Sequence, residues 1–110
     1  MARYVLMVVT SPVEGKDEEY NRWYNEEHLR DVLGCDGFSR AERFELTVPV
    51  MGQFPGKYVA LYEMETDDPM RDFGKLGAKM QGGELSQTDS MSTESGIALL
   101  TPLKTLAKGE

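Results

Sequence analysis

Glu19-Tyr-Asn-Arg-Trp-Tyr-Asn-Glu-Glu-His-Leu-Arg-Asp-Val-Leu33 is the stretch that decides the fold of this 110-residue chain. Asp17 and Glu18 come just before it, and acidic residues in a first turn are favoured by the helix dipole. The pattern predicts a helix from about Lys16 to Leu33, followed by Gly34 as a left-handed cap. At about 100° per residue, these side chains share one side of the helix: Tyr20, Trp23, Tyr24, Glu27, His28 and Val32.

His28 is the single histidine of the chain. Histidine is the one side chain whose unperturbed pKa lies near neutral pH, so it suits acid–base chemistry. Two interpretations of this helix face are open. The aromatic rings form core around a hydrogen-bonded structural histidine, or the imidazole and the rings face a ligand pocket.

The rest of the chain contains four predicted strands. The segments Tyr4–Val9 and Tyr58–Met64 are apolar at most positions, whereas Phe38–Val48 alternates between two faces. A fourth strand is expected from Met91 to Leu100. Residues 101–110 are expected to form a tail.

A second helix is expected between the third and fourth strands. Asp67 is its predicted cap and Pro69 stands in its first turn, where proline is well tolerated. Gly82-Gly83 is expected to end it.

The predicted order is therefore β-α-β-β-α-β within one domain spanning residues 1–110. This order is typical of the ferredoxin-like α+β fold, a four-stranded antiparallel sheet with two helices on one face. The first and third strands carry apolar residues on both faces, and a chain of this size has no third layer to cover the second face. We therefore expect a homodimer whose sheets pack face to face.

Composition restricts the partners. Twelve Lys and Arg against 19 Asp and Glu give a net charge of −7, whereas nucleic acids and anionic membranes bind clustered basic residues. No apolar run approaches the roughly 20 residues of a membrane span. Cys35 is the only cysteine, so no internal disulfide can form, and we expect a cytoplasmic protein without nucleic-acid or membrane partners.

Two segments carry a resemblance to a known family. The stretch Glu19–Leu33, with its Trp-Tyr-x-x-x-His pattern, is followed by Asp36-Gly-Phe-Ser-Arg-Ala-Glu-Arg-Phe44. Together they resemble the EthD-like group of the dimeric α+β barrel superfamily, in which a Gly-Phe opens the second strand and an Ala-x-Arg lies within it. Asp36 departs from the pattern, because many such sequences have proline there.

The resemblance implies a homodimeric barrel with a ligand pocket between helices and sheet in each subunit. It does not imply one reaction, since its relatives include lactone isomerases, polyketide cyclases, decarboxylases, cofactor-independent monooxygenases and haem-degrading enzymes. The site residues must therefore decide the chemistry.

We expect three residues to carry that chemistry. His28 is the candidate general acid or base, and Arg43 is the candidate that holds an enolate, phenolate or carboxylate. Glu27 is the candidate that orients the imidazole, with an acid from a strand, such as Glu63, as the alternative. A salt bridge from Arg43 to Glu45 or Glu63 is the alternative. The expected substrate-binding residues are aromatic: Tyr20, Trp23, Tyr24, Tyr62 and Tyr4.

We expect neither a metal nor a cofactor. One histidine beside a few carboxylates lacks the clustered ligands of zinc or iron sites, and no glycine-rich phosphate loop follows a strand.

Three functions remain open. The favoured one is a cofactor-free lyase, isomerase, decarboxylase or cyclase acting on a small aromatic or polyketide-like compound. The alternatives are an oxygen-using relative, either a cofactor-independent monooxygenase or a haem-degrading enzyme with His28 on iron, and a non-catalytic dimeric module that binds a small ligand.

Overall fold

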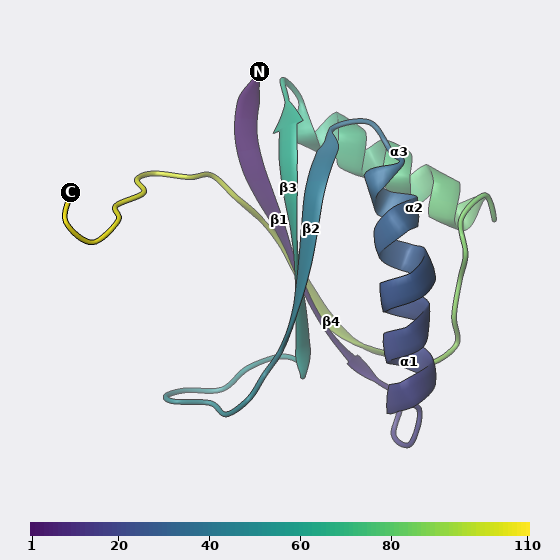
Figure 1. The fold of residues 1–110 in the computed structure, drawn as a ribbon. Helices are drawn as coiled ribbons and strands as arrows, with labels where there is room; N and C mark the ends of the chain where they lie inside the picture. The colour runs from purple at the N-terminus through teal and green to yellow at the C-terminus, as the bar shows by residue number, and fades with distance from the viewer.

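The computed structural model describes residues 1–110 (Figure 1). Its elements are β1 (Ala2–Pro12), α1 (Asp17–Trp23), the π-helical turn η1 (Tyr24–His28), α2 (Leu29–Leu33), β2 (Phe38–Glu45), β3 (Tyr58–Thr66), α3 (Pro69–Gln81) and β4 (Met91–Leu100).

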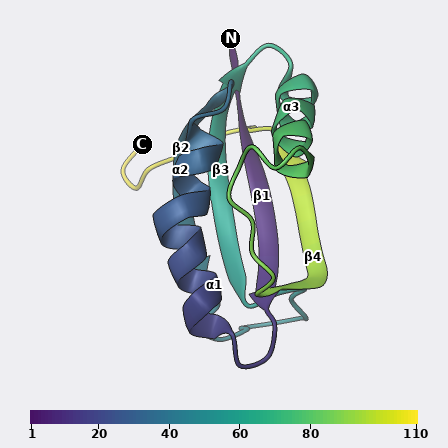
Figure 2. The ribbon, with the colours of Figure 1, turned by 90° about the vertical axis from the view of Figure 1, so that its right-hand side faces the viewer.

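The four strands form one antiparallel sheet in the order β2-β3-β1-β4. Both helical segments lie on the same face of this sheet (Figure 1) and flank β1 when viewed from the helical side (Figure 2). The chain therefore has the ferredoxin-like α+β fold that the element order predicted. The fourth strand has its predicted bounds, and Gly82 follows the last residue of α3 as expected.

Strand β3 shows how the sheet divides the chain into a covered and an uncovered face. Its alternate residues Tyr58, Ala60, Tyr62, Met64 and Thr66 are all buried against the helices, while the residues between them are partly or fully exposed. All of these helix-facing side chains except Thr66 belong to a cluster of 12 buried residues that forms the core.

The first helix runs through α1, η1 and α2, but it is not α-helical throughout. In η1 the backbone N–H of Leu29 bonds to the carbonyl of Tyr24, five residues earlier. This wider turn changes which residues share a face, because the α-helical repeat of 3.6 residues no longer applies. Glu27, which the α-helical repeat placed beside His28, is exposed.

Gly34 caps the first helix as predicted, but not in the predicted left-handed conformation, and the predicted cap of the second helix, Asp67, is wrong. Gly34 has a right-handed conformation, with φ of −76°, and the left-handed glycine of this turn is Gly37, with φ of +90°. Helix α3 is capped by Asp68, whose carboxylate accepts the backbone N–H of Arg71. Asp67 instead pairs with the Arg71 guanidinium at 3.1 Å.

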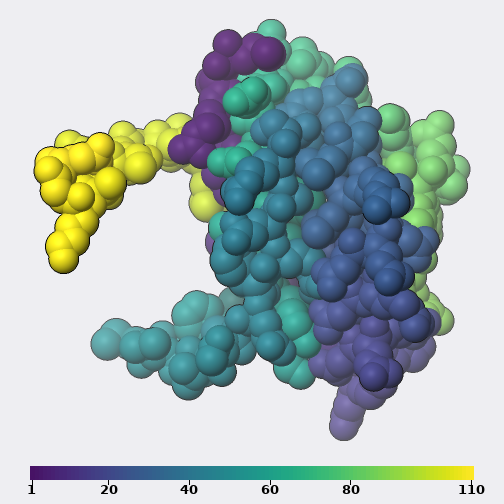
Figure 3. Space-filling view, in the orientation of Figure 1, coloured from purple at the N-terminus to yellow at the C-terminus, as the bar shows by residue number.

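Two segments project from the compact part of the chain. Strand β2 ends at Glu45, three residues earlier than predicted, and the loop 46–57 that follows extends on the side of the sheet away from the helices. Residues 101–110 extend on the same side, and both segments stand out as separate arms in Figure 3. None of the helices combines the length and apolar character that a membrane crossing requires.

Gly37 provides a test of this architecture. Its positive φ disfavours any side chain, and an added Cβ would collide with the carboxylate of Asp72 in α3. We predict that Gly37→Ala lowers the free energy of unfolding by about 1–3 kcal/mol. Gly74→Ala is the matched control, since nothing lies within 4 Å of its added Cβ, and alanine in a helix should stabilise by up to about 1 kcal/mol. Urea unfolding measures both; equal effects would contradict the described turn.

Candidate functional site

A cavity of about 250 Å³ lies between the helices and the sheet. Its wall is mostly apolar, and its polar side chains are few, which is the usual character of a small-molecule site. Strands β1, β3 and β4 contribute to it, as do α3 and all three parts of the first helix, α1 only through its last residue. The lining residues are Leu6, Val8, Thr10, Trp23, Tyr24, His28, Val32, Tyr62, Phe73, Leu76, Gly77, Met80, Met91, Ser95 and Ile97.

The π-helical turn places His28 in this wall. The imidazole stacks on the indole of Trp23, with ring centroids 4.5 Å apart and planes 18° from parallel. These residues are five positions apart, a spacing that a π turn aligns and an α turn does not. The ring of Tyr24 meets the imidazole edge-on at 5.0 Å. His28 is thus fixed by two aromatic neighbours.

His28 is neutral and has no polar partner. Its Nδ1 is buried without a hydrogen bond. Burial, the main cause, lowers the pKa of His28 to about 4, with a further lowering by Arg43 and an opposing effect of the Asp31 carboxylate. An unpartnered polar atom beside an apolar cavity is a group ready to bind a ligand.

Two tyrosines supply hydroxyl groups to the cavity. The Tyr62 hydroxyl donates to that of Tyr24 at 3.5 Å, and both side chains are buried. Burial raises the pKa of both phenols. At neutral pH the two groups therefore keep their protons and serve as hydrogen-bond donors.

Arg43 lies outside the cavity. Its guanidinium donates to Asn25 Oδ1 at 2.7 Å and to Asn21 Oδ1 at 2.9 Å, instead of pairing with Glu45 or Glu63. The cation also lies 4.3 Å from the ring centroid of Tyr24. The structure thus brings Arg43 to the aromatic cluster but not to the space that His28 faces.

Three other predicted site residues also lie outside the cavity wall. Tyr20 is buried and its hydroxyl bonds with Thr10 Oγ1. Tyr4 is half-buried and packs against the core cluster. Glu27 is exposed and accepts a hydrogen bond from Ser86 Oγ at 2.8 Å, with no hydrogen bond to His28. Of the predicted residues, the cavity contains His28, Trp23, Tyr24 and Tyr62.

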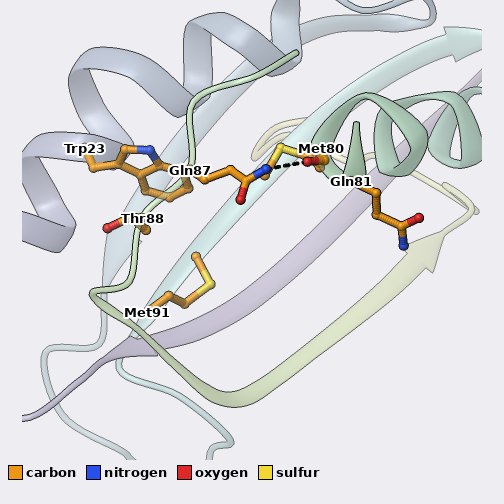
Figure 4. A pocket seen from close by; sticks show the side chains of 6 residues that line it. All are labelled: Trp23, Met80, Gln81, Gln87, Thr88 and Met91. Carbon is orange, nitrogen blue, oxygen red and sulfur yellow. Dashed lines mark hydrogen bonds between the residues drawn. The ribbon is translucent and has the colours of Figure 1, made fainter. Parts of the chain in front are cut away.

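Several residues that line the cavity were not predicted from the sequence. Strand alternation in β1 and β4 was the available signal for Thr10 and Ser95, which lie opposite each other in the register of the two strands. Met80 and Met91 also line an open groove of about 390 Å³ outside the cavity (Figure 4). Trp23, Met80 and Met91 line both the cavity and the groove.

The charged and metal-ligating side chains around this cavity are few. No group of three or more His, Cys, Asp or Glu side chains is arranged to hold a metal ion. Sites for drug-sized ligands have volumes of roughly 300–1,000 Å³, and this cavity, at about 250 Å³, is smaller.

Comparison with known proteins supports the fold. No family model and no curated protein matches the sequence. The crystal structure of a protein described as a putative monooxygenase from Shewanella loihica PV-4 is similar, with a TM-score of 0.65 and 12% sequence identity. The similarity covers 94% of this chain and 97% of that one. The two proteins therefore share a fold.

The low pKa of His28 predicts a pH-dependent stability. The unfolded chain binds a proton at His28 near pH 6.5, whereas the folded chain binds it only near pH 4. The free energy of unfolding should therefore fall as pH drops from about 7 to 4, by roughly 3 kcal/mol from this group. Chemical unfolding of wild type and His28→Gln at several pH values isolates the contribution. Parallel curves for the two proteins would contradict the burial of a neutral imidazole.

Proposed function

We propose that this protein is a cofactor-free enzyme in which His28 takes a proton from a small, flat, largely apolar substrate. The single observation that supports it most is the neutral, unpartnered imidazole in the wall of an apolar cavity. We also propose that the protein belongs to the EthD-like group, on the strength of the Trp-Tyr-x-x-x-His and Ala-x-Arg patterns.

The proton comes from a phenolic O–H or from a C–H next to a carbonyl. An imidazole nitrogen of His28 accepts it, leaving a phenolate or enolate in the cavity. The Tyr24 hydroxyl, which accepts from Tyr62 and keeps its own proton free, is the donor placed to stabilise the negative oxygen. The anion and the imidazolium form a pair, and this nearby negative charge raises the pKa of His28 above its value in the empty cavity.

Arg43 supports this charge distribution from behind the aromatic ring. Its cation lies over the ring of Tyr24, and a positive charge there favours negative charge on the cavity side of the phenol. We therefore assign Arg43 an electrostatic role through Tyr24 and not direct contact with the substrate.

A second candidate function begins with the same proton transfer to His28. The S. loihica protein of similar fold is described as a putative monooxygenase. An electron-rich phenolate or enolate is the species that donates an electron to dioxygen. In this version the substrate anion is oxidised and dioxygen is reduced, without haem.

His28→Gln tests the assignment of the base. Against a panel of small phenols, hydroquinones and β-dicarbonyl compounds, we expect this variant to lose about 10²–10⁴-fold in kcat. Glu26→Gln is the control, because Glu26 lies in the same π-helical turn but is exposed and does not line the cavity. Assays with and without oxygen separate the two candidate reactions.

Equal turnover by wild type and His28→Gln would refute His28 as the base. Tight binding of a panel compound without turnover by wild type would favour the non-catalytic binding module instead.

We further propose that the protein works as a homodimer through the uncovered sheet face. The register places Val5, Met7, Val59, Leu61 and Phe44 on the face away from the helices. Apolar residues are also exposed on the loop and tail that extend from this side, among them Val50 and Leu103 at 92% and 97%. Large exposed apolar surfaces usually mark an interface.

Leu61→Glu tests this interface by introducing a charge at the centre of the sheet face. We predict a dimer for wild type and a monomer for Leu61→Glu in sedimentation at micromolar concentration, because an unpaired buried charge opposes association. Val13→Glu is the control, since Val13 lies in the exposed turn after β1. A monomeric wild type would contradict the proposed dimer.

A further inference from the structure

The segment Gly82–Ser90 links α3 to β4 without forming a helix or strand. It passes across the space between the two helical segments, on the helical side of the sheet (Figure 2). At one side Gln87 Nε2 donates to the Met80 carbonyl at 2.5 Å (Figure 4). We call this segment the strap, because it crosses from one helical segment to the other; none of its residues is among those that line the cavity.

One residue attaches the strap to the first helix. Ser86 Oγ accepts the indole N–H of Trp23 at 3.1 Å and donates to Glu27 Oε1 at 2.8 Å. The backbone N–H of Ser86 donates to Asp31 Oδ2 at 3.0 Å. Three residues from three parts of the helix, α1, η1 and α2, thus converge on a single serine.

The bond to Trp23 matters for the site because Trp23 holds His28. His28 forms no hydrogen bond of its own, and its ring is fixed by stacking on Trp23 and by the edge contact with Tyr24. Stacking permits sliding and rotation in the ring plane, whereas a hydrogen bond to the indole nitrogen restrains the partner ring. The Ser86–Trp23 bond is therefore the polar restraint on this stack.

We propose that Ser86 is a positioning residue: its hydrogen bond to the indole holds Trp23, and through Trp23 it holds the imidazole of His28 in place and covered. A catalytic role for Ser86 rests on the proposed function, but the position of the His28 imidazole can be tested without an activity assay.

The charges around His28 set the direction of the expected change. Asp31 on α2 and Arg43 on β2 are the charged groups that influence it, with opposite effects, and the cavity residues from α3, β1 and β4 are uncharged. Burial is the main cause of the lowered pKa. A Trp23 ring released from Ser86 covers the stacked face of the imidazole less completely and so weakens that cause, and the pKa of His28 rises toward its ordinary value near 6.5.

Ser86→Ala removes the hydroxyl and is compared with two variants. Ser86→Thr restores a hydroxyl at the same position, and Ser39→Ala deletes an exposed hydroxyl that bonds to the Glu63 carbonyl in β3, far from the strap. The single histidine and the single tryptophan let each ring be followed without assignment, the first by the proton NMR shift of its Cε1–H, the second by fluorescence.

In Ser86→Ala we expect the pKa of His28 to rise by about one unit or more and the emission of Trp23 to shift to longer wavelength. On a substrate turned over by wild type, we expect kcat to fall about tenfold, the loss for one group acting through another. Ser86→Thr should restore all three values, and Ser39→Ala should leave them unchanged.

An unchanged pKa and emission in a folded Ser86→Ala protein would overturn the proposal. If Ser86→Ala does not fold, Trp23→Phe replaces it, because phenylalanine keeps a ring against His28 but lacks the N–H. The same rise in pKa supports the proposal, and an unchanged pKa overturns it. A raised pKa in a protein that turns over no panel compound supports the positioning of the ring and refutes the proposed catalytic function.

Discussion

The stack of the His28 imidazole on the Trp23 indole is the contact on which the site depends. It forms because the first helix changes from an α to a π turn between Tyr24 and His28. Residues five positions apart are then aligned, and the imidazole of His28, the only histidine, lies in the wall of the cavity. π-helical turns are uncommon and occur often at functional sites. Here the turn has a definite consequence, since in an uninterrupted α-helix the two side chains would leave the axis about 140° apart, too far for their rings to stack.

The chemistry follows from what surrounds that stack. Trp23, Tyr24 and Tyr62 exclude water, so the imidazole stays neutral, and the phenols keep their protons for the same reason. A neutral base and neutral donors face one apolar space, while the nearest cation, Arg43, stays behind Tyr24. Such a site favours a neutral, flat substrate that becomes an anion only after it has given up its proton. A charged substrate would lose its hydration without a matching counter-charge.

The fold was largely predictable because it rests on periodicity. Buried alternation in β3 and the apolar stripes of the helices produce a β-α-β-β-α-β order, and sequence alone carries that information. The wrong details depend on single turns. Gly34 caps the helix without a left-handed conformation, and the requirement for glycine falls instead on Gly37, through its positive φ and the approach of Asp72 from α3.

The candidate site was predictable only in part. His28, Trp23, Tyr24 and Tyr62 were identified, because aromatic residues cluster on the helix and on a central strand. Glu27 was wrongly predicted to face the imidazole, because the spacing of apolar residues along the sequence does not show where an α-helix widens into a π turn. Ser86 was missed since it lies in an irregular segment, where only the tertiary structure shows that it bonds to Trp23.

The most direct test is an NMR pH titration of the wild-type protein, following the Cε1–H of His28, the only histidine in the chain. The structure predicts a resonance that stays at its neutral-form position from pH 8 down to about 5.5, because the pKa of His28 is lowered to about 4 by burial. A curve with its midpoint near 6.5 would show an imidazole in contact with water, and the site described here would not exist in solution.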